Sequence, residues 1–71
     1  MKTKQLSVRV TITPVASYLY LVWGSGNDVR LFSIDIYKGT YAAEWAKKDG
    51  ASLAEFLDVP ICEVTRPGDP L

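Results

Sequence analysis

The sequence predicts an α+β fold, an antiparallel β-meander of three strands plus a short C-terminal strand, covered on one face by one or two short helices. Three observations predict it. Residues 5–13 alternate between apolar and polar side chains, residues 18–37 hold two β-forming runs around a turn cluster, and residues 41–58 show helical spacing. The 71 residues, 1–71, make a single small domain.

The first expected strand covers residues 5–13. Its side chains alternate, and those that point to one side are all apolar: Leu6, Val8, Val10 and Ile12. This alternation is typical of a strand with one face on the core and the other face in water. Pro14 has no backbone N–H to give to a neighbouring strand, so we expect the strand to end there.

A β-hairpin is expected next, with strands near 18–24 and 29–37. If Gly24 faces Val29, one face of the hairpin becomes apolar, with Leu19 facing Ile34 and Leu21 facing Phe32. The other face is then polar and aromatic: Tyr18, Tyr20, Ser33, Asp35 and Tyr37. A slip of one residue would mix the two kinds of side chain, so this register is the expected one.

The helical region is expected to form two pieces. Thr40 is a plausible N-cap for a first helix near 41–49, which Gly50 would end. Ser52 and Glu55 match a capping box that would start a shorter helix near 53–58. The residues expected in the core are Trp45, Leu21, Phe32, Ile34, Val10, Phe56 and Leu57.

A short fourth strand is expected near 61–65. Pro60 biases the preceding Val59 away from helix, and the segment ICEVT that follows is rich in β-branched residues.

The amino-acid composition lacks the residues that most kinds of catalysis need. The chain has no histidine, which excludes triads that need one. Its single cysteine, Cys62, falls in an expected strand, where we expect a buried, inert thiol. With one cysteine, no histidine and no calcium-loop spacing of carboxylates, we expect no metal, no cofactor and no enzymatic activity.

Charge and hydropathy indicate which partners and which cellular location to expect. The formal net charge is zero, which lacks the basic balance of a nucleic-acid binder. No apolar run approaches the roughly 18–20 residues that cross a bilayer, and the start of the chain does not read as a signal peptide. One cysteine excludes an internal disulfide framework, so we expect a cytoplasmic protein.

One alternative concerns DNA. Residues 52–66, SLAEFLDVPICEVTR, resemble the core of a helix-turn-helix, with Ala54 at the position of tight helix contact. The resemblance covers 15 of 71 residues and implies a small DNA-binding regulator. The sequence departs from that pattern at Pro67, which would stop the second helix, and at 61–65, which favour a strand.

The polar and aromatic face supports two further interpretations. Single-stranded nucleic acid could stack on its tyrosines, near Arg9 and Lys38. The preferred hypothesis is a protein-binding module, a small inhibitor or accessory protein that blocks a larger partner. Its expected contact residues are Tyr18, Tyr20, Tyr37, Asp35 and Arg9. Small size, neutral charge and scarcity of motifs make the chain similar in general character to bacteriophage inhibitors of host defence, anti-CRISPR proteins among them, and open sheet edges predict a homodimer.

Overall fold

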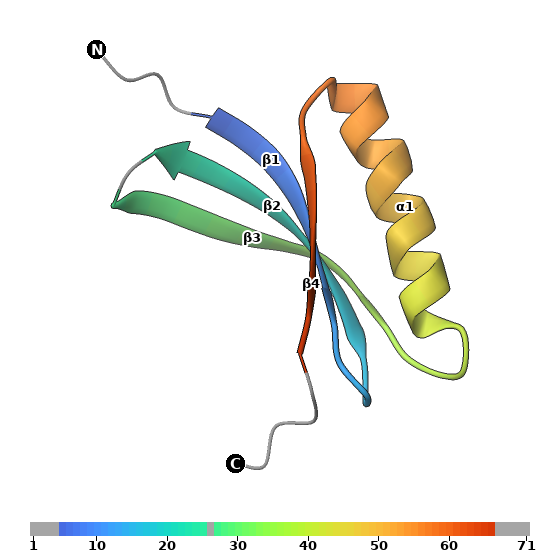
Figure 1. Cartoon of the computed structure of the whole chain (residues 1–71). Coiled ribbons are helices and arrows are strands. Elements are labelled where there is room, and N and C mark those ends of the chain that lie inside the picture. Colours follow the sequence, from blue (N-terminus) through green and yellow to red (C-terminus); the bar gives the residue numbers. More distant parts are fainter. Residues whose placement is uncertain (1–4, 26, 67–71) are drawn as a thin grey trace.

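The computed structural model describes residues 5–25 and 27–66. Within them the chain forms strands β1 (Gln5–Ile12), β2 (Ser17–Ser25) and β3 (Asp28–Tyr37), helix α1 (Ala42–Leu57) and strand β4 (Ile61–Thr65). The helix packs on one face of a single four-stranded sheet (Figure 1). The predicted α+β class and the predicted strands are therefore confirmed, and the helical layer is one helix of 16 residues.

The order of strands in the sheet is β3-β2-β1-β4. The first three strands form the expected antiparallel meander, whereas β4 runs parallel to β1 and pairs with it from Val8 opposite Ile61 to Ile12 opposite Thr65. Parallel neighbours need a long crossover connection, and α1 supplies it by carrying the chain from the β3 edge to the β4 edge. Strand β1 is consequently central, with a partner on each side.

The hairpin register agrees with the sequence near the turn and differs from it further along. Gly24 faces Val29 and Leu21 faces Phe32, as predicted. A β-bulge then shifts the register between Leu19 and Tyr20, so that Leu19 faces Asp35 where the sequence pattern places Ile34. A bulge inserts one extra residue into one strand, which moves every later side chain of that strand to the opposite face.

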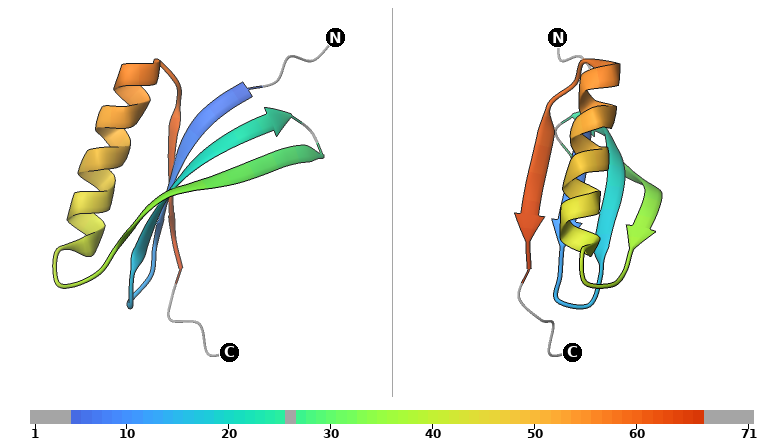
Figure 2. Two further views of the ribbon diagram at one scale, coloured as in Figure 1. Left: turned by 180° about the vertical axis from the view of Figure 1, so that it is seen from behind. Right: turned by 90° about the vertical axis from the view of Figure 1, so that its right-hand side faces the viewer.

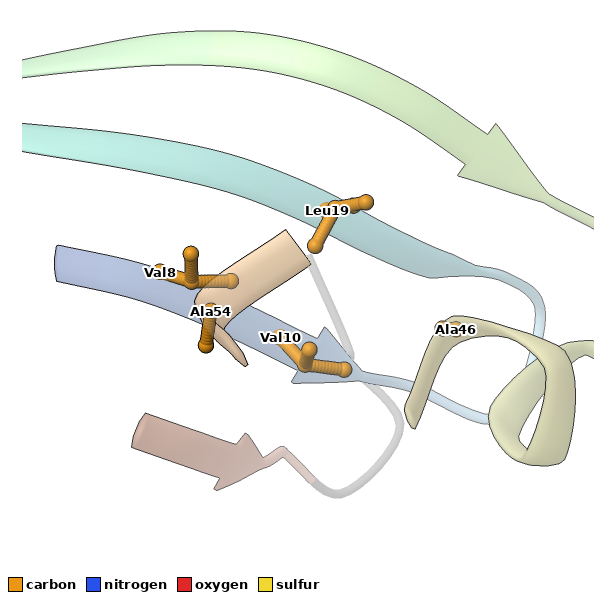
Figure 3. Close-up of a cluster of buried hydrophobic side chains, with 5 residues drawn as sticks. All are labelled: Val8, Val10, Leu19, Ala46 and Ala54. Carbon is orange, nitrogen blue, oxygen red and sulfur yellow. The ribbon is translucent and has the colours of Figure 1, made fainter. Parts of the chain in front are cut away.

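Small residues form the face of α1 that touches the sheet. The buried residues of the helix are Ala42, Ala46, Gly50 and Ala54. Ala46 and Ala54 join the core cluster with three side chains from the sheet, as Figure 3 shows: Val8, Val10 and Leu19. A helix lined with alanine and glycine can lie close to the sheet, and the core is correspondingly thin.

Gly50 marks the closest approach and does not end the helix. A Cβ atom added to Gly50 would lie 2.6 Å from Val10 Cγ2 and 3.2 Å from Ile61 Cδ1, so only glycine fits there without a shift of its neighbours. The predicted helix end at Gly50 and the predicted capping box at Ser52 are therefore wrong, since Ser52 lies inside one continuous helix.

Most of the large side chains predicted to be in the core are exposed. Val10 is fully buried and Leu21 packs against the core, as expected. Trp45 is 53% exposed and Phe56 is 85% exposed, because α1 turns its stripe of alanine and glycine to the sheet and both aromatic residues lie off that stripe. The remaining three predicted core residues are also classed as exposed: Phe32, Ile34 and Leu57.

The ends of α1 use backbone conformation more than side-chain caps. The N-cap is Tyr41, and no side chain makes a capping hydrogen bond, so the predicted Thr40 cap is wrong. At the other end Asp58 adopts the left-handed conformation, with φ of 58°, and Val59 N–H donates to the Ala54 carbonyl at 3.0 Å. This backbone arrangement ends a helix sharply, and Pro60 then begins the approach to β4 as expected.

The turn end of the β2–β3 hairpin lies away from α1. Figure 2 shows the helix over one end of the sheet, with the hairpin turn extending beyond it. Trp23 and Phe32 near that end are 38% and 51% exposed, although both alternate onto the helix side of the sheet. Among the described residues, no element covers either face of the hairpin near its turn.

Candidate protein-binding surface

The face of the sheet opposite α1 carries no covering element among the described residues. Its composition follows from alternation along each strand. Leu19 is buried against α1, so its neighbours Tyr18 and Tyr20 point to the open face. Likewise Arg9 lies between the buried Val8 and Val10 and points away from the helix. Arg9 is directly opposite Tyr20 in the β1–β2 pairing.

Two tyrosines and one arginine form the centre of this open face. The rings of Tyr18 and Tyr20 are stacked, with centroids 6.1 Å apart and planes inclined by 19°. Both tyrosines are half-buried, which means that neighbouring side chains already restrict them. The Nε atom of Arg9 is buried and has no hydrogen-bond partner among the described residues. The guanidinium therefore holds a desolvated donor beside the aromatic pair.

Aliphatic side chains surround this centre and make the face more apolar than the sequence suggests. Val22 and Leu31 form one cross-strand pair of the face, and Tyr18 and Ile36 form another. Leu31 is 51% exposed and Ile36 is 52% exposed. An unbroken alternation along β3 would put Ile36 on the same face as Ile34, and the bulge in β3 brings it next to Tyr18. A strand-alternation pattern contains no signal for that change.

Two predicted contact residues, Tyr37 and Asp35, do not lie on this face. After the bulge Asp35 pairs with the buried Leu19 and Tyr37 pairs with the buried Ser17, so both alternate onto the helix side. The Tyr37 hydroxyl donates to Asp49 Oδ2 at 2.7 Å. Burial, together with this hydrogen bond, raises the pKa of the Tyr37 phenol above its usual value. The structure thus unites Tyr18, Tyr20 and Arg9 and separates the other two.

Cys62 also belongs to the open face. It pairs with Arg9 in the parallel register, and its neighbour Ile61 lies on the helix side near Gly50. The expectation of a buried thiol is wrong, because Cys62 is exposed. The position of β4 at the edge of the sheet explains the difference, since an edge strand has a partner on one side only.

A second surface lies on the outer side of α1. Tyr41, Glu44, Trp45 and Lys48 line an open groove of about 380 Å³. Lys48 Nζ lies 5.3 Å from the centroid of the Trp45 ring, within the range of a cation–π contact. All four residues come from α1 and its N-cap, so this groove is a shallow feature of a single element and lacks the convergent walls of a ligand pocket.

The structure does not form the helix-turn-helix that residues 52–66 resemble. The first part of this segment is the end of α1, but Ile61–Thr65 is a strand, so no recognition helix follows. Extra pairing extends this strand at both ends, since Val8 N–H donates to the Pro60 carbonyl at 2.9 Å and Arg66 N–H donates to the Ile12 carbonyl at 2.8 Å.

Residues 5–25 and 27–66 contain no cluster of three or more side chains suited to hold a metal ion. Over the same residues, no helix combines the length and the apolar character that a bilayer crossing needs.

Comparison with protein families, with curated proteins and with solved structures finds no significant match to this chain.

Proposed function

We propose that this protein is a non-enzymatic binding module that docks its open sheet face on a larger protein and blocks that protein's own ligand site. The observation that carries the proposal is the uncovered face, where stacked Tyr18 and Tyr20 lie beside Arg9 among half-exposed aliphatic side chains. Tyrosine and arginine are enriched among the residues that dominate binding energy at protein interfaces.

Arg9 adds a polar requirement to this apolar surface. Arg9 brings a positive charge to the open face, and a hydrogen bond from its guanidinium to a charged acceptor would be stronger than one between neutral groups. The partner is therefore expected to present a carboxylate or a carbonyl oxygen over Arg9, surrounded by apolar groups that cover the tyrosines. This combination gives the interface an orientation as well as an apolar area.

The proposal places the protein in the general class of small inhibitors or accessory proteins, similar in character to the phage-encoded inhibitors of host defence. A cytoplasmic, reducing setting suits it, because its one thiol, Cys62, is exposed. Self-association as a homodimer is part of the same proposal, since a domain of this size buries only a modest fraction of its surface alone.

The test starts with affinity capture from the source cell, followed by mass spectrometry, and continues with the purified partner. The Tyr18→Ala/Tyr20→Ala double variant should lose capture, because truncation of interface anchors costs about 2 kcal/mol or more for each residue. Tyr41→Ala is the matched control, since Tyr41 is 62% exposed on the outer side of the helix and outside the open face. The melting temperature of each variant should show that it still folds under the conditions of the capture.

Cys62 provides an independent measurement of where the partner binds. It is the only cysteine of the chain, and it lies on the open face opposite Arg9. A partner that covers this face should slow alkylation of the Cys62 thiol, and its own ligand should restore the rate by competition. Full reactivity of the thiol in the complex would move the site elsewhere, first to the groove around Trp45 and Lys48 on α1.

Nucleic acid is the alternative outcome of the same capture. Stacking on Tyr18 and Tyr20 beside Arg9 would retain single-stranded nucleic acid in place of protein, and the binding would weaken steeply as salt concentration rises. Nuclease treatment before capture separates the two cases. Capture that disappears after nuclease treatment would overturn the proposal.

A further inference from the structure

We propose that strand β3 pairs antiparallel with β3 of a second copy, so that the two sheets join into one continuous sheet across a twofold axis at Leu31. This inference rests on the self-association proposed above and names the residues that would form it. It is independent of the tyrosine-dependent capture of a larger protein.

The free edge of β3 is the first observation. The strand has ten residues and lies at the end of the strand order, so alternate backbone N–H and C=O groups face away from β2. The other edge is β4, which has only five residues. Natural sheets commonly protect edges by keeping them short or by bulges; β3 is long, and its bulge, between Ser33 and Asp35, lies past the segment centred on Leu31.

The side chains of β3 are the second observation. Val29 and Leu31 on the open face are 49% and 51% exposed, and Phe32 on the helix side is 51% exposed. Exposed apolar side chains therefore lie on both faces of β3 near the hairpin end, although the strand lies at the edge of the sheet. Pairing of two copies would bury part of this apolar surface.

The third observation is that β3 is complementary to itself around Leu31. A twofold axis at this residue places Leu31 opposite its own copy and Val29 opposite Ser33. The same register places Arg30 opposite Phe32 twice, which sets a cation beside an aromatic ring at both ends of the centre. An isologous interface requires this kind of matching within one patch.

Two further features permit this register. The hairpin end of β3 extends beyond α1, so the helix does not obstruct that part of the edge (Figure 2). Beyond Asp35 the edge is partly closed, because Ile36 N–H already donates to Asp35 Oδ1 at 2.8 Å. The formal net charge of the chain is zero, so two copies meet without net electrostatic repulsion.

Sedimentation equilibrium of the full chain over a range of concentrations gives the first test. The native protein should dimerise, and Leu31→Lys should raise the dimer dissociation constant about tenfold or more by placing two ammonium groups at the axis. Val15→Lys is the matched control, because Val15 is 80% exposed in the β1–β2 turn, away from the β3 edge. Its dissociation constant should equal that of the native chain, and the melting temperature should verify folding of both variants.

A covalent probe gives the second test. Both cysteine variants are made in a Cys62→Ser background. In Leu31→Cys the sulfur atoms of the two copies should meet at the axis and oxidise to a covalent dimer. Val29→Cys should not form this dimer, since residue 29 faces Ser33 of the other copy. The proposed β3–β3 pairing would be overturned if Leu31→Lys still dimerised like the native chain. Equal oxidation of the two cysteine variants would overturn it too. A native chain that stays monomeric would also overturn the proposed pairing of β3 with a second β3. Tyrosine-dependent capture of a larger protein would still stand in that case. The free edge of β3 would then be open to an extended segment of that protein.

Discussion

The hydroxyl of Tyr37 donates a hydrogen bond of 2.7 Å to Asp49 Oδ2, which ties the last residue of β3 to the middle of α1. The bond depends on the bulge in β3, because the bulge turns Tyr37 from the open face to the helix side. One inserted residue thus removes a tyrosine from the candidate interface and gives it a structural role.

Replacement of Tyr37 by phenylalanine should lower the free energy of unfolding by about 1 kcal/mol at pH 7, the typical value of one such hydrogen bond. Urea denaturation measures it. Tyr41→Phe is the control, because the Tyr41 ring is 62% exposed. Equal losses in the two variants would contradict the role given to Asp49.

Alkaline pH should weaken the fold through the same residue. Because folding raises the pKa of the Tyr37 phenol, the unfolded chain loses this proton first, near pH 10. The stabilisation is therefore complete below pH 10 and is lost as the pH rises toward the folded-state pKa. The native chain should lose more unfolding free energy than Tyr37→Phe between pH 9 and about pH 11. Parallel pH profiles would contradict this assignment.

Gly50→Ala should destabilise the protein, although this change normally stabilises a helix interior by up to about 1 kcal/mol. The new methyl group would meet Val10 Cγ2 at 2.6 Å, and overpacking of this kind costs about 1–3 kcal/mol. Thermal unfolding measures the sign of the effect. Ser52→Ala, at an exposed position of the same helix, is the control and should be neutral or slightly stabilising. A more stable Gly50→Ala variant would refute the close contact.

Truncation of large side chains should separate the true core from the exposed surface. Leu19→Ala should cost about 2–5 kcal/mol, because Leu19 is only 3% exposed and lies in the central cluster. Trp45→Ala should cost about 1 kcal/mol or less, since its ring is half exposed and its recorded ring contact is with Lys48. A larger loss at Trp45 than at Leu19, measured by chemical denaturation, would mean that the helix packs differently.

Local patterns predicted the strands, the hairpin turn and the end of α1 before Pro60, because each depends on neighbouring residues. The bulge was not predictable, since the polar and apolar residues of β3 alternate through it without a break. The orientation of α1 was missed for a different reason. Hydrophobicity favours Trp45 as the buried residue, whereas the distance between helix and sheet selects Ala46 and Gly50. For the candidate site, alternation correctly grouped Tyr18, Tyr20 and Arg9 and misplaced Tyr37 and Asp35.

The parallel pairing of β1 with β4 has a consequence for the order of folding. Strand β1 is synthesised first, yet its second neighbour is synthesised after α1, and the alanines that cover Val8 and Val10 come only with that helix. The meander therefore leaves the ribosome with its apolar face open to water. Contacts between distant parts of a chain are slow to form, so completion of the sheet by β4 should be a late step in folding.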